Sequence, residues 1–368
     1  MRVLLLAAWP AFPLSHGGRM RVFRLASGLA RVGAAVELRF PWTPGTSRKP
    51  FVRDGVVCHP ELRATLPLLP LPEGVLPSAL PTSWQRLLPS GRRALRDARG
   101  FDVVQVESPG YGSWLGRLQG PAARVYASHN VEADFARAAA RTVARLERLA
   151  VRDSDLVLAC TEADGHRFRG LYGDDVRFAV VPNGFDDALL DADVADLRDP
   201  ARERLGLAHE ERAVLFVGGG ADHNRKAVRF LERDVLPALA PETRLLVAGR
   251  AAAALEGADP RRTLALGYVE DLAGLLAAAD VAVNPVAYGS GSNLKMAEYM
   301  AAGLPVVTTP VGLRGFERWA GSMAVAELDG FATAIREAPG RGAPPEGIEE
   351  LGWRRIAGAL HEVYEGLL

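Results

Sequence analysis

Residues 289–298 carry the side chains and turn chemistry that could bind a phosphate group. They follow an apolar run, residues 281–285, that predicts a buried strand, and they lead into a predicted helix that ends at Gly303. A strand, a glycine-rich turn and a helix N-terminus together offer backbone amides and a favourable dipole to an anion. Lys295 lies in this segment, although the chain has only 3 lysines against 41 arginines.

On a helical period, Gly291, Lys295 and Glu298 are spaced i, i+4 and i+7, so we expect all three on one face. A cation beside backbone amides, with a carboxylate one turn further on, suits a diphosphate joined to a sugar that carries hydroxyl groups. The alternative is an ordinary amphipathic helix that follows a turn and binds nothing.

With 368 residues, 48% of them apolar, the chain is long enough for two domains with packed cores. Its two cysteines, Cys58 and Cys160, lack metal-ligand spacing, which is typical of a reduced cytosolic protein. No apolar run reaches the roughly 20 residues that a membrane-spanning helix needs. The apolar start is short and interrupted by Pro10 and Pro13, so we expect a buried first strand there and not a signal peptide.

The formal net charge of zero hides an uneven distribution. Residues 1–150 carry 21 Lys and Arg against 10 Asp and Glu, whereas residues 151–368 carry 23 against 34. A basic first half indicates an anionic partner, such as a phosphorylated acceptor or a peripheral contact with the inner face of a membrane. The alternative is that arginines only decorate solvated helix faces. Nucleic acid is disfavoured as a partner, because no basic stripe is interleaved with aromatic residues and the second half is acidic.

Short apolar segments alternate with helix-like segments in the first half, which predicts a parallel sheet covered on both faces. The expected strands and helices are residues 3–8, 35–40, 103–106, 124–128, 156–160 and 176–181, and residues 18–32 and 133–152. Residues 41–100 interrupt this alternation, because dense prolines exclude a long helix. This excursion could line an acceptor pocket or touch a membrane, or it could be a surface insertion.

A second alternating series follows the turn residues Pro182, Asn183 and Gly184 and an acidic linker. Its expected strands are residues 213–217, 245–248, 263–266, 281–283, 306–309 and 323–326. We therefore expect an α/β protein with two doubly wound, Rossmann-like domains. Their expected bounds are 1–184 and 185–350, and a terminal helix occupies 351–368. Ligands of such sheets bind at the carboxyl ends of the strands.

Several segments, in their order and spacing, resemble the retaining glycosyltransferases of the GT-B fold, in the large family 4 group. These segments are residues 17–18, 129–132, 181–184, 224–230, 267–271, 289–298 and 303–309. The resemblance covers most of the chain, and residues 41–100 are the least covered. It implies an acceptor domain and a nucleotide-sugar donor domain that face each other across a cleft. It also implies that the terminal helix packs back on the first domain.

The resemblance implies roles for single residues. His129 would lie beside the transferred sugar and polarise a hydroxyl, and Lys226 would neutralise charge on the leaving diphosphate; these are the expected catalytic residues. The residues expected to bind the donor diphosphate are Gly17, Gly18, Arg225, Lys226, Gly291, Ser292, Asn293 and Lys295. Gly17 and Gly18, which lack a Cβ, could instead allow close backbone approach to the acceptor. For His129, the alternative is a histidine that only ends a strand with its hydrogen bonds satisfied.

Glu298 would hydrogen-bond the ribose hydroxyls, and Ser290 would face the donor sugar or the ribose. His16 and Glu132 are expected on the acceptor side, although Glu132 could instead be a carboxylate that the helix dipole favours. Ser290 stands where the family usually has a glutamate. Ala221 stands where the family usually has an arginine, with Arg225 as the nearest substitute. These departures are compatible with a donor sugar that has fewer or rearranged hydroxyls, or with weak activity.

We therefore expect a cytoplasmic enzyme that transfers a sugar from a nucleotide diphosphate sugar, UDP by default, to a hydroxyl or amine with retention. The acceptor would be a secondary metabolite, a lipid or a polysaccharide. The sequence does not predict an oligomeric state. Catalysis would come from positioning and from stabilising the leaving diphosphate, without cofactor or metal. The Asp-x-Asp spacings at residues 153–155 and 191–193 are expected to solvate or cap. The alternatives are a nucleotide-sugar epimerase of the same fold and a non-catalytic nucleotide-sugar-binding subunit.

Overall fold

The computed structural model describes residues 1–14, 17–61, 93, 96–118, 120, 123–135, 140–192, 194–255, 257–289 and 291–368. Residues 62–92, which belong to the proline-rich segment predicted to line an acceptor pocket, touch a membrane or form a surface insertion, lie outside this part of the chain, as do His16 and Ser290. The chain forms two compact units. Unit 1 comprises Met1–Pro182 and Trp353–Leu368, and unit 2 comprises Asn183–Gly352.

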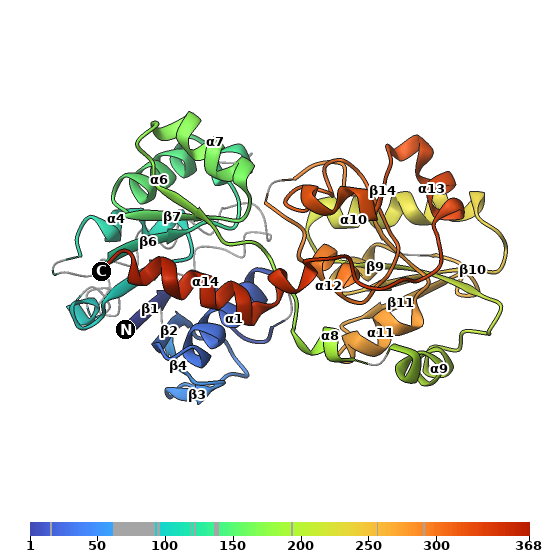
Figure 1. The fold of residues 1–368 in the computed structure, drawn as a ribbon, viewed down its shortest axis with the longest axis horizontal. Helices are drawn as coiled ribbons and strands as arrows, with labels where there is room; N and C mark the ends of the chain where they lie inside the picture. The colour runs from blue at the N-terminus through green and yellow to red at the C-terminus, as the bar shows by residue number, and fades with distance from the viewer. Residues whose placement is uncertain are drawn as a thin grey trace. The chain divides into compact units, whose positions relative to one another are not determined.

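Unit 1 is built on an eight-stranded sheet with the order β3-β4-β2-β1-β5-β6-β7-β8 (Figure 1). All neighbouring strands are parallel except β3 and β4. The strands are β1 (Arg2–Leu6), β2 (Ala35–Pro41), β3 (Phe51–Arg53), β4 (Val56–Glu61), β5 (Val103–Val106), β6 (Ala123–Ala127), β7 (Leu156–Ala159) and β8 (Phe178–Val180). The chain extends from β1 to one edge and returns to β5, so the topological switch point lies between β1 and β5.

Helices cover the sheet of unit 1. They are α1 (Gly17–Arg31), α4 (Gly112–Leu115), α5 (Glu132–Phe135), α6 (Ala140–Arg152), α7 (Glu162–Tyr172) and α14 (Trp353–Glu365). On one face, Val104 and Val106 of β5 share a core with Phe168 of α7. Helices α1 and α14 lie side by side (Figure 1) and approach closely, since a Cβ added to Gly28 would lie 2.4 Å from the Cβ of Ala357.

The edge of this sheet contains a hairpin that the sequence analysis does not predict. Strand β3 runs antiparallel to β4 and joins it through Asp54 and Gly55, whose φ angles are 48° and 79°. An Asp-Gly pair with two positive φ angles is typical of a two-residue hairpin turn, so this dipeptide is a usable signal. The dense prolines that follow obscure it, because they favour an irregular excursion over the whole of residues 41–100.

Unit 2 contains a six-stranded parallel sheet with the order β11-β10-β9-β12-β13-β14. Its strands are β9 (Arg212–Val217), β10 (Thr243–Ala248), β11 (Thr263–Gly267), β12 (Val281–Asn284), β13 (Val306–Thr308) and β14 (Ala324–Val325). Its helices are α8 (Ala188–Asp191), α9 (Val194–Arg204), α10 (Asp222–Phe230), α11 (Leu272–Ala278), α12 (Leu294–Ala301) and α13 (Phe331–Glu337). The switch point of this sheet lies between β9 and β12.

Every strand expected from the sequence is present, with ends that differ by at most two residues. The predicted helix at residues 18–32 is α1, displaced by one residue. The predicted helix at residues 133–152 corresponds to α5 and α6, and residues 136–139 lie outside the described residues. The doubly wound α/β prediction is therefore confirmed for both halves of the chain.

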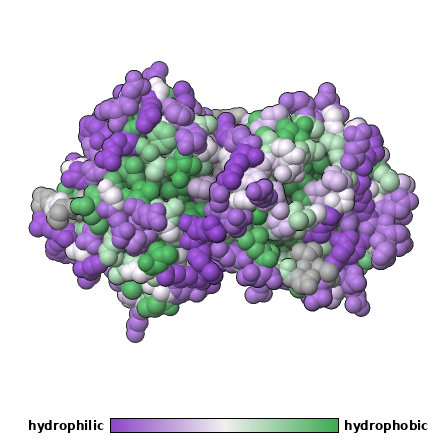
Figure 2. Space-filling view, viewed as in Figure 1, coloured by the Kyte–Doolittle hydropathy of each residue, from purple (hydrophilic) through white to green (hydrophobic). Residues whose placement is uncertain are grey.

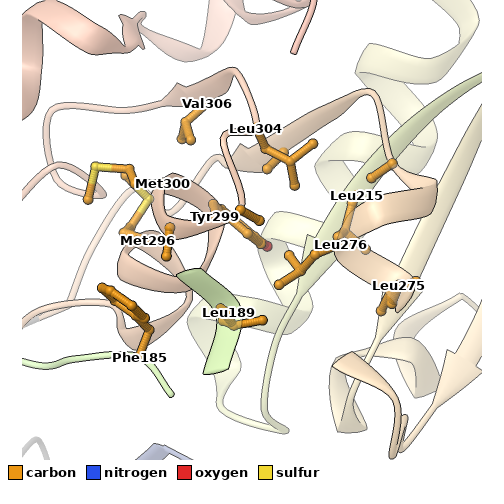
Figure 3. Close-up of a cluster of buried hydrophobic side chains, with 14 of the residues drawn as sticks. Phe185, Leu189, Leu215, Leu275, Leu276, Met296, Tyr299, Met300, Leu304 and Val306 are labelled. Atoms are coloured by element: carbon orange, nitrogen blue, oxygen red, sulfur yellow. The ribbon is translucent and has the colours of Figure 1, made fainter. Parts of the chain in front are cut away.

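A buried cluster fixes α12 against the sheet of unit 2. Figure 3 shows Met296 and Tyr299 of α12 among other apolar side chains, with Leu215 of β9 in the same cluster. Tyr299 is fully buried, and its hydroxyl accepts a hydrogen bond of 2.7 Å from the backbone amide of Val217. This bond holds α12 at the carboxyl end of β9, so the helix that carries Lys295 has a defined position.

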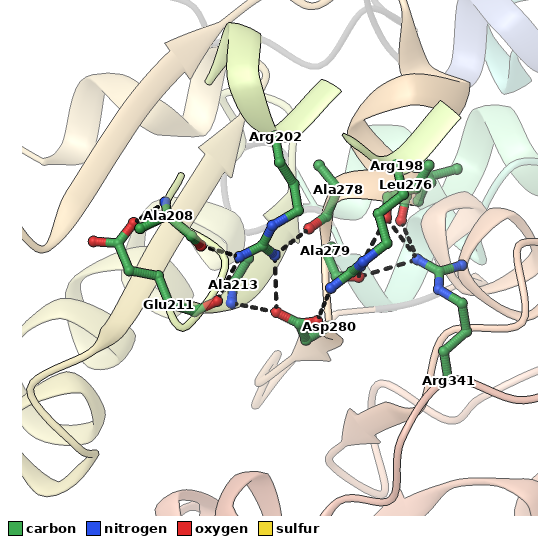
Figure 4. Close-up of polar contacts among 11 residues, drawn as sticks. Arg198, Arg202, Ala208, Glu211, Ala213, Leu276, Ala278, Ala279, Asp280 and Arg341 are labelled. Atoms are coloured by element: carbon green, nitrogen blue, oxygen red, sulfur yellow. Dashed lines mark hydrogen bonds and ion pairs between the residues drawn. The ribbon is translucent and has the colours of Figure 1, made fainter. Parts of the chain in front are cut away.

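Arginine side chains bind backbone carbonyls at the C-terminal end of α11 (Figure 4). The guanidinium of Arg202, which is buried, donates to three carbonyl oxygens at 2.6–3.1 Å, those of Ala208, Glu211 and Ala278. Arg198 donates to the carbonyls of Ala277 and Ala279 at 3.0 and 3.1 Å. A guanidinium is planar and has five N–H donors, so it can bind several carbonyl oxygens at once, whereas a lysine ammonium has three donors on a single nitrogen. Part of the abundance of arginine thus has a structural cause.

The part of the chain that the structure describes contains no helix long and apolar enough to cross a membrane. On the face shown in Figure 2, hydrophilic residues cover much of the surface, and apolar residues form patches among them. Both cysteines, Cys58 and Cys160, are buried and free. Burial raises the pKa of the Cys58 thiol to about 11, so this thiol is unreactive at neutral pH.

Candidate functional site

At the carboxyl end of β12 the chain makes a glycine-rich turn before α12 begins at Leu294. Gly289 and Gly291 have φ angles of 144° and 68°, which residues with a side chain rarely adopt. Gly291 therefore belongs to the turn, and the prediction that it shares a helical face with Lys295 and Glu298 is wrong. Those two side chains, three residues apart within α12, do share a face.

Lys295 is a buried cation at the start of α12. Its Nζ donates a hydrogen bond of 3.1 Å to Oδ1 of Asn224 and lies 4.0 Å from the centroid of the Phe216 ring. Burial lowers the pKa of Lys295 to about 7, against the opposing charge of Glu298. A lysine held in this way changes its charge within the physiological range, and it would regain its ordinary pKa beside an anion.

His223, in the first turn of α10, is close enough to Lys295 to be affected by its charge. Burial, together with the charge of Lys295, lowers the pKa of His223 to about 4, so its imidazole is neutral at physiological pH. Its ring meets the ring of Tyr288 edge-on at a centroid distance of 6.3 Å. Neither His223 nor Asn224 is among the site residues predicted from the sequence, although both come just after a buried strand, where such residues are expected to gather.

Two side chains from other parts of unit 2 hold the glycine-rich turn. The Nδ2 of Asn183 donates to both the carbonyl oxygen and the Oγ of Ser292, each at 3.0 Å. The Nη1 of Arg314 donates to the carbonyl oxygen of Gly289 at 3.2 Å. The turn that carries the predicted diphosphate ligands Gly291, Ser292 and Asn293 is thus held near both of its ends by hydrogen bonds from within unit 2.

Lys226 has quite different surroundings from Lys295. Its side chain is 57% exposed, and its Nζ lies 3.2 Å from Oδ2 of Asp222 and 5.0 Å from the centroid of the Tyr288 ring. The hydroxyl of Tyr288 and the carboxylate of Asp222 raise the pKa of Lys226, so it is a permanent cation. The neighbouring Arg225 donates to the carbonyl of Gly220 at 2.9 Å. The two predicted phosphate lysines therefore occupy one exposed and one buried position.

In unit 1, the predicted donor residues Gly17 and Gly18 are the first two residues of α1. They follow β1 at the switch point of the sheet, and Gly17 is exposed. Their backbone amides therefore belong to the first turn of a helix, whose amides have no partner within the helix itself.

His129 lies at the carboxyl end of β6, where residues from two neighbouring strands meet it. Its Nε2 is 2.9 Å from Oε2 of Glu107, which follows β5, and its ring meets the ring of Trp9, which follows β1, at a centroid distance of 5.1 Å and an angle of 78°. Glu107 is not among the site residues predicted from the sequence. The usable signal is a carboxylate that directly ends a buried strand beside the one that leads to His129.

Glu132 begins α5 beside a second, fully buried carboxylate, Glu147. Glu147 accepts hydrogen bonds from the backbone amides of Glu132 and Ala133 at 2.8 and 3.0 Å, and from the hydroxyls of Tyr126 and Tyr172 at 3.2 and 2.7 Å. It therefore caps the N-terminus of α5 from another helix. Burial and the charge of Glu147 raise the pKa of Glu132 to about 7.

This pKa predicts how the stability of the protein depends on pH. A carboxyl group whose pKa rises on folding holds its proton where the unfolded chain would lose it. Its contribution to stability is therefore complete below about pH 4.5 and is lost as the pH rises through about 7. We expect Glu132→Gln to flatten the fall in melting temperature between pH 5 and pH 8, as measured by calorimetry. An unchanged fall in that variant would contradict this assignment.

No group of three or more His, Cys, Asp or Glu side chains with the geometry to hold a metal ion occurs among the described residues. Of the two Asp-x-Asp segments, Asp153 pairs with Arg152, and Asp155 accepts a 2.7 Å hydrogen bond from the backbone amide of Arg124. These carboxylates serve local hydrogen bonds at the start of β7. Asp193, in the second segment, lies outside the described residues.

The sequence matches two family models, one over each half of the chain. The model described as "Glycosyl transferase 4-like domain" matches residues 16–184, and the model described as "Glycosyl transferases group 1" matches residues 211–338. No curated protein sequence is significantly similar to the chain.

Solved structures with the same fold cover nearly the whole chain. The sucrose-phosphate synthase of Thermosynechococcus elongatus has a TM-score of 0.80 at 20% identity, over 100% of this chain and 98% of that one. WaaG, a glycosyltransferase involved in lipopolysaccharide biosynthesis, has a TM-score of 0.68 at 18% identity, over 98% and 95%. Anabaena HepE in complex with UDP-glucose has a TM-score of 0.70 at 17% identity, over 99% and 96%. With two doubly wound units of the GT-B architecture and a match in each half, the chain belongs to the group 1, family 4-like glycosyltransferases.

Proposed function

We propose that this glycosyltransferase transfers a sugar from a UDP-sugar to a hydroxyl or amine of its acceptor, with retention at the anomeric carbon. The observation that carries the proposal is the buried Lys295 beside the glycine-rich turn. Within the described residues, its Nζ donates to the neutral amide of Asn224, and the charge of Glu298 offsets only part of the effect of burial on its pKa. Burying such a cation costs free energy unless a counter-charge arrives, and a diphosphate supplies that charge.

The other groups around Lys295 suit the remaining parts of a nucleotide diphosphate. The backbone amides near Gly291, Ser292 and Asn293 can donate to phosphate oxygens at the start of α12. Glu298, buried on the same helical face as Lys295, can accept hydrogen bonds from ribose hydroxyls. We choose UDP because the structurally similar HepE has been crystallised with UDP-glucose. In this assignment the leaving diphosphate is stabilised by fixed cations and amides, without a metal.

The exposed cations and the residues of unit 1 receive secondary roles in this proposal. Lys226 and Arg225 reach the phosphates from the outer side of the turn. His129 polarises a hydroxyl of the transferred sugar, and Glu132, with its pKa of about 7, lies on the acceptor side, where it can exchange a proton at neutral pH. We assign Gly17 and Gly18 to close backbone approach at the start of α1.

Titration of the protein with UDP, GDP, TDP and ADP in the presence of a chelator tests this proposal, with thermal shift and calorimetry as readouts. Specific stabilisation by UDP is expected. The sugar conjugates of that nucleotide then follow, and slow hydrolysis with an α-configured product from an α-linked donor supports a retaining transferase. A change in the sugar without an acceptor would identify an epimerase, binding without turnover would identify a binding subunit, and no response to any nucleotide would overturn the donor site.

The low pKa of Lys295 predicts that binding of the donor is coupled to the uptake of a proton from the solvent by this lysine. At pH 8 this lysine is mostly neutral, and a bound diphosphate should restore its charge, so binding should take up nearly one proton per site. UDP-glucose is the best probe, because its diphosphate does not itself titrate near neutrality. Calorimetry in two buffers of different ionisation enthalpy measures the uptake. We expect Lys295→Arg to abolish it, and an equal uptake in that variant would place the titrating group elsewhere.

A further inference from the structure

Four polar side chains form a continuous hydrogen-bonded chain inside unit 1, and His129 is its outermost member. The Nε2 of His129 lies 2.9 Å from Oε2 of Glu107. The Nε2 of Gln105 donates to Oε1 of the same carboxylate, and the hydroxyl of Tyr364 donates to Oε1 of Gln105. The chain therefore runs from the carboxyl end of β6, through β5, to the C-terminal helix α14.

Three of the four side chains in this hydrogen-bonded chain are buried, and burying polar groups costs free energy unless they are hydrogen-bonded. Gln105 and Tyr364 are fully buried and Glu107 is 1% exposed, whereas the side chain of His129 keeps 14% of its surface in solvent. Buried polar groups reduce stability unless each one is hydrogen-bonded, so apolar residues would serve a purely structural core as well. The hydrogen-bonded chain instead connects three buried side chains with His129, whose imidazole is still accessible to a ligand.

The geometry also fixes which way each group points. Gln105 and Glu107 are two residues apart at β5, so their side chains emerge on the same face of the sheet, opposite to Val104 and Val106. That face carries α14, which supplies Tyr364. Burial and Glu107 raise the pKa of the Tyr364 hydroxyl, whereas a buried guanidinium, Arg21, lies close enough to lower it. Arg21 also donates to the carbonyl oxygens of Val181 and Pro182.

We propose that Glu107 is a positioning residue for His129, held in place by Gln105 and Tyr364. This inference rests on the catalytic role proposed above for His129. The carboxylate accepts a hydrogen bond from Nε2–H, which fixes the tautomer of the neutral imidazole and leaves Nδ1 as the acceptor nitrogen. Trp9 restrains the ring through its edge-on contact. The terminal helix thus supports the catalytic histidine through three hydrogen bonds, and no contact of its own with the ligand is needed.

Glu107→Gln is the direct test, because it keeps the shape of the side chain and removes its charge. We expect the rate of UDP-glucose hydrolysis to fall by about 10- to 100-fold. The affinity for UDP, which depends on unit 2, should stay within about twofold. The readout that a merely structural role would not change is the nitrogen NMR spectrum of the imidazole. The Nε2–H tautomer of His129, assigned by comparison with His129→Gln, should be lost.

Unit 1 offers a matched control, because a second carboxylate lies near another histidine. The Oε1 of Glu37 is 3.7 Å from Nε2 of His59. Glu37→Gln removes a carboxylate beside a histidine in the same sheet, yet it should leave both the hydrolysis rate and the spectrum of His129 unchanged. Tyr364→Phe removes only the far end of the chain and should give a smaller fall in rate than Glu107→Gln.

The outcomes separate this inference from the proposed function. If Glu107→Gln alters neither the rate nor the tautomer of His129, the positioning role is overturned while UDP binding and turnover stand. If the wild type binds no nucleotide, the proposed function fails, and the tautomer measurement still decides whether Glu107 holds His129. Should Glu107→Gln not fold, Glu107→Asp replaces it, with an intermediate rate and a shifted Nε2 resonance expected; an unchanged rate and spectrum would overturn the inference.

Discussion

Lys295→Met should weaken the binding of UDP-glucose by about 100-fold and yet leave the protein at least as stable as the wild type. The loss of affinity follows from removing a charged donor in a buried site, which is worth about 3 kcal/mol. The gain in stability follows from the same burial, because the pKa near 7 shows that the folded protein disfavours this charge. Methionine keeps the apolar stem that packs near Phe216. Calorimetric titration and thermal unfolding measure the two effects.

The other lysines of the chain provide the controls for this prediction. Lys226 is more than half exposed and already paired with Asp222, so Lys226→Ala should weaken binding by only about tenfold. Lys49 is exposed in unit 1, and Lys49→Ala should have no effect on either measurement. A larger loss from Lys226→Ala than from Lys295→Met would transfer the main phosphate role to Lys226. Equal affinity in Lys295→Met and the wild type would exclude the buried site altogether.

Glu147→Ala should reduce the free energy of unfolding by about 3–5 kcal/mol. The carboxylate accepts four hydrogen bonds, so its removal leaves two tyrosine hydroxyls and the first two amides of α5 without their acceptor in a buried place. The loss should appear as a lower midpoint of urea unfolding. Because Glu132 is the first residue of α5, loss of this cap should also disturb the position of Glu132, which we propose lies on the acceptor side.

Glu162 is a suitable control for this stability prediction. It lies on α7 of the same unit with 73% of its side chain exposed, so Glu162→Ala should change the free energy of unfolding by no more than about 0.5 kcal/mol. A change below about 1 kcal/mol for Glu147→Ala would mean that water replaces the lost carboxylate. In that case α5 would not depend on this cap.

The local pattern of the sequence was sufficient for the strands, because short apolar runs between turn residues are specific for buried parallel strands. It was insufficient for the hairpin at Asp54 and Gly55, where a two-residue signal stands before a long proline-rich stretch. Within α12, the spacing of Lys295 and Glu298 gave their common face directly, since three residues nearly complete one helical turn. Gly291 failed the same argument because the helix starts three residues later.

Taken alone, the sequence determined the two doubly wound α/β units and the strand-turn-helix segment that carries Lys295, because both depend on contacts between near neighbours in the chain. Only the tertiary structure decided that Lys295 is buried against Asn224 while Lys226 is exposed beside Asp222. It alone joined Glu107 to His129 and, across 259 residues, Gln105 to Tyr364. Burial and these pairings depend on which strands become neighbours in the sheet and on which helix covers them. The spacing of residues along one strand or helix does not determine either of these.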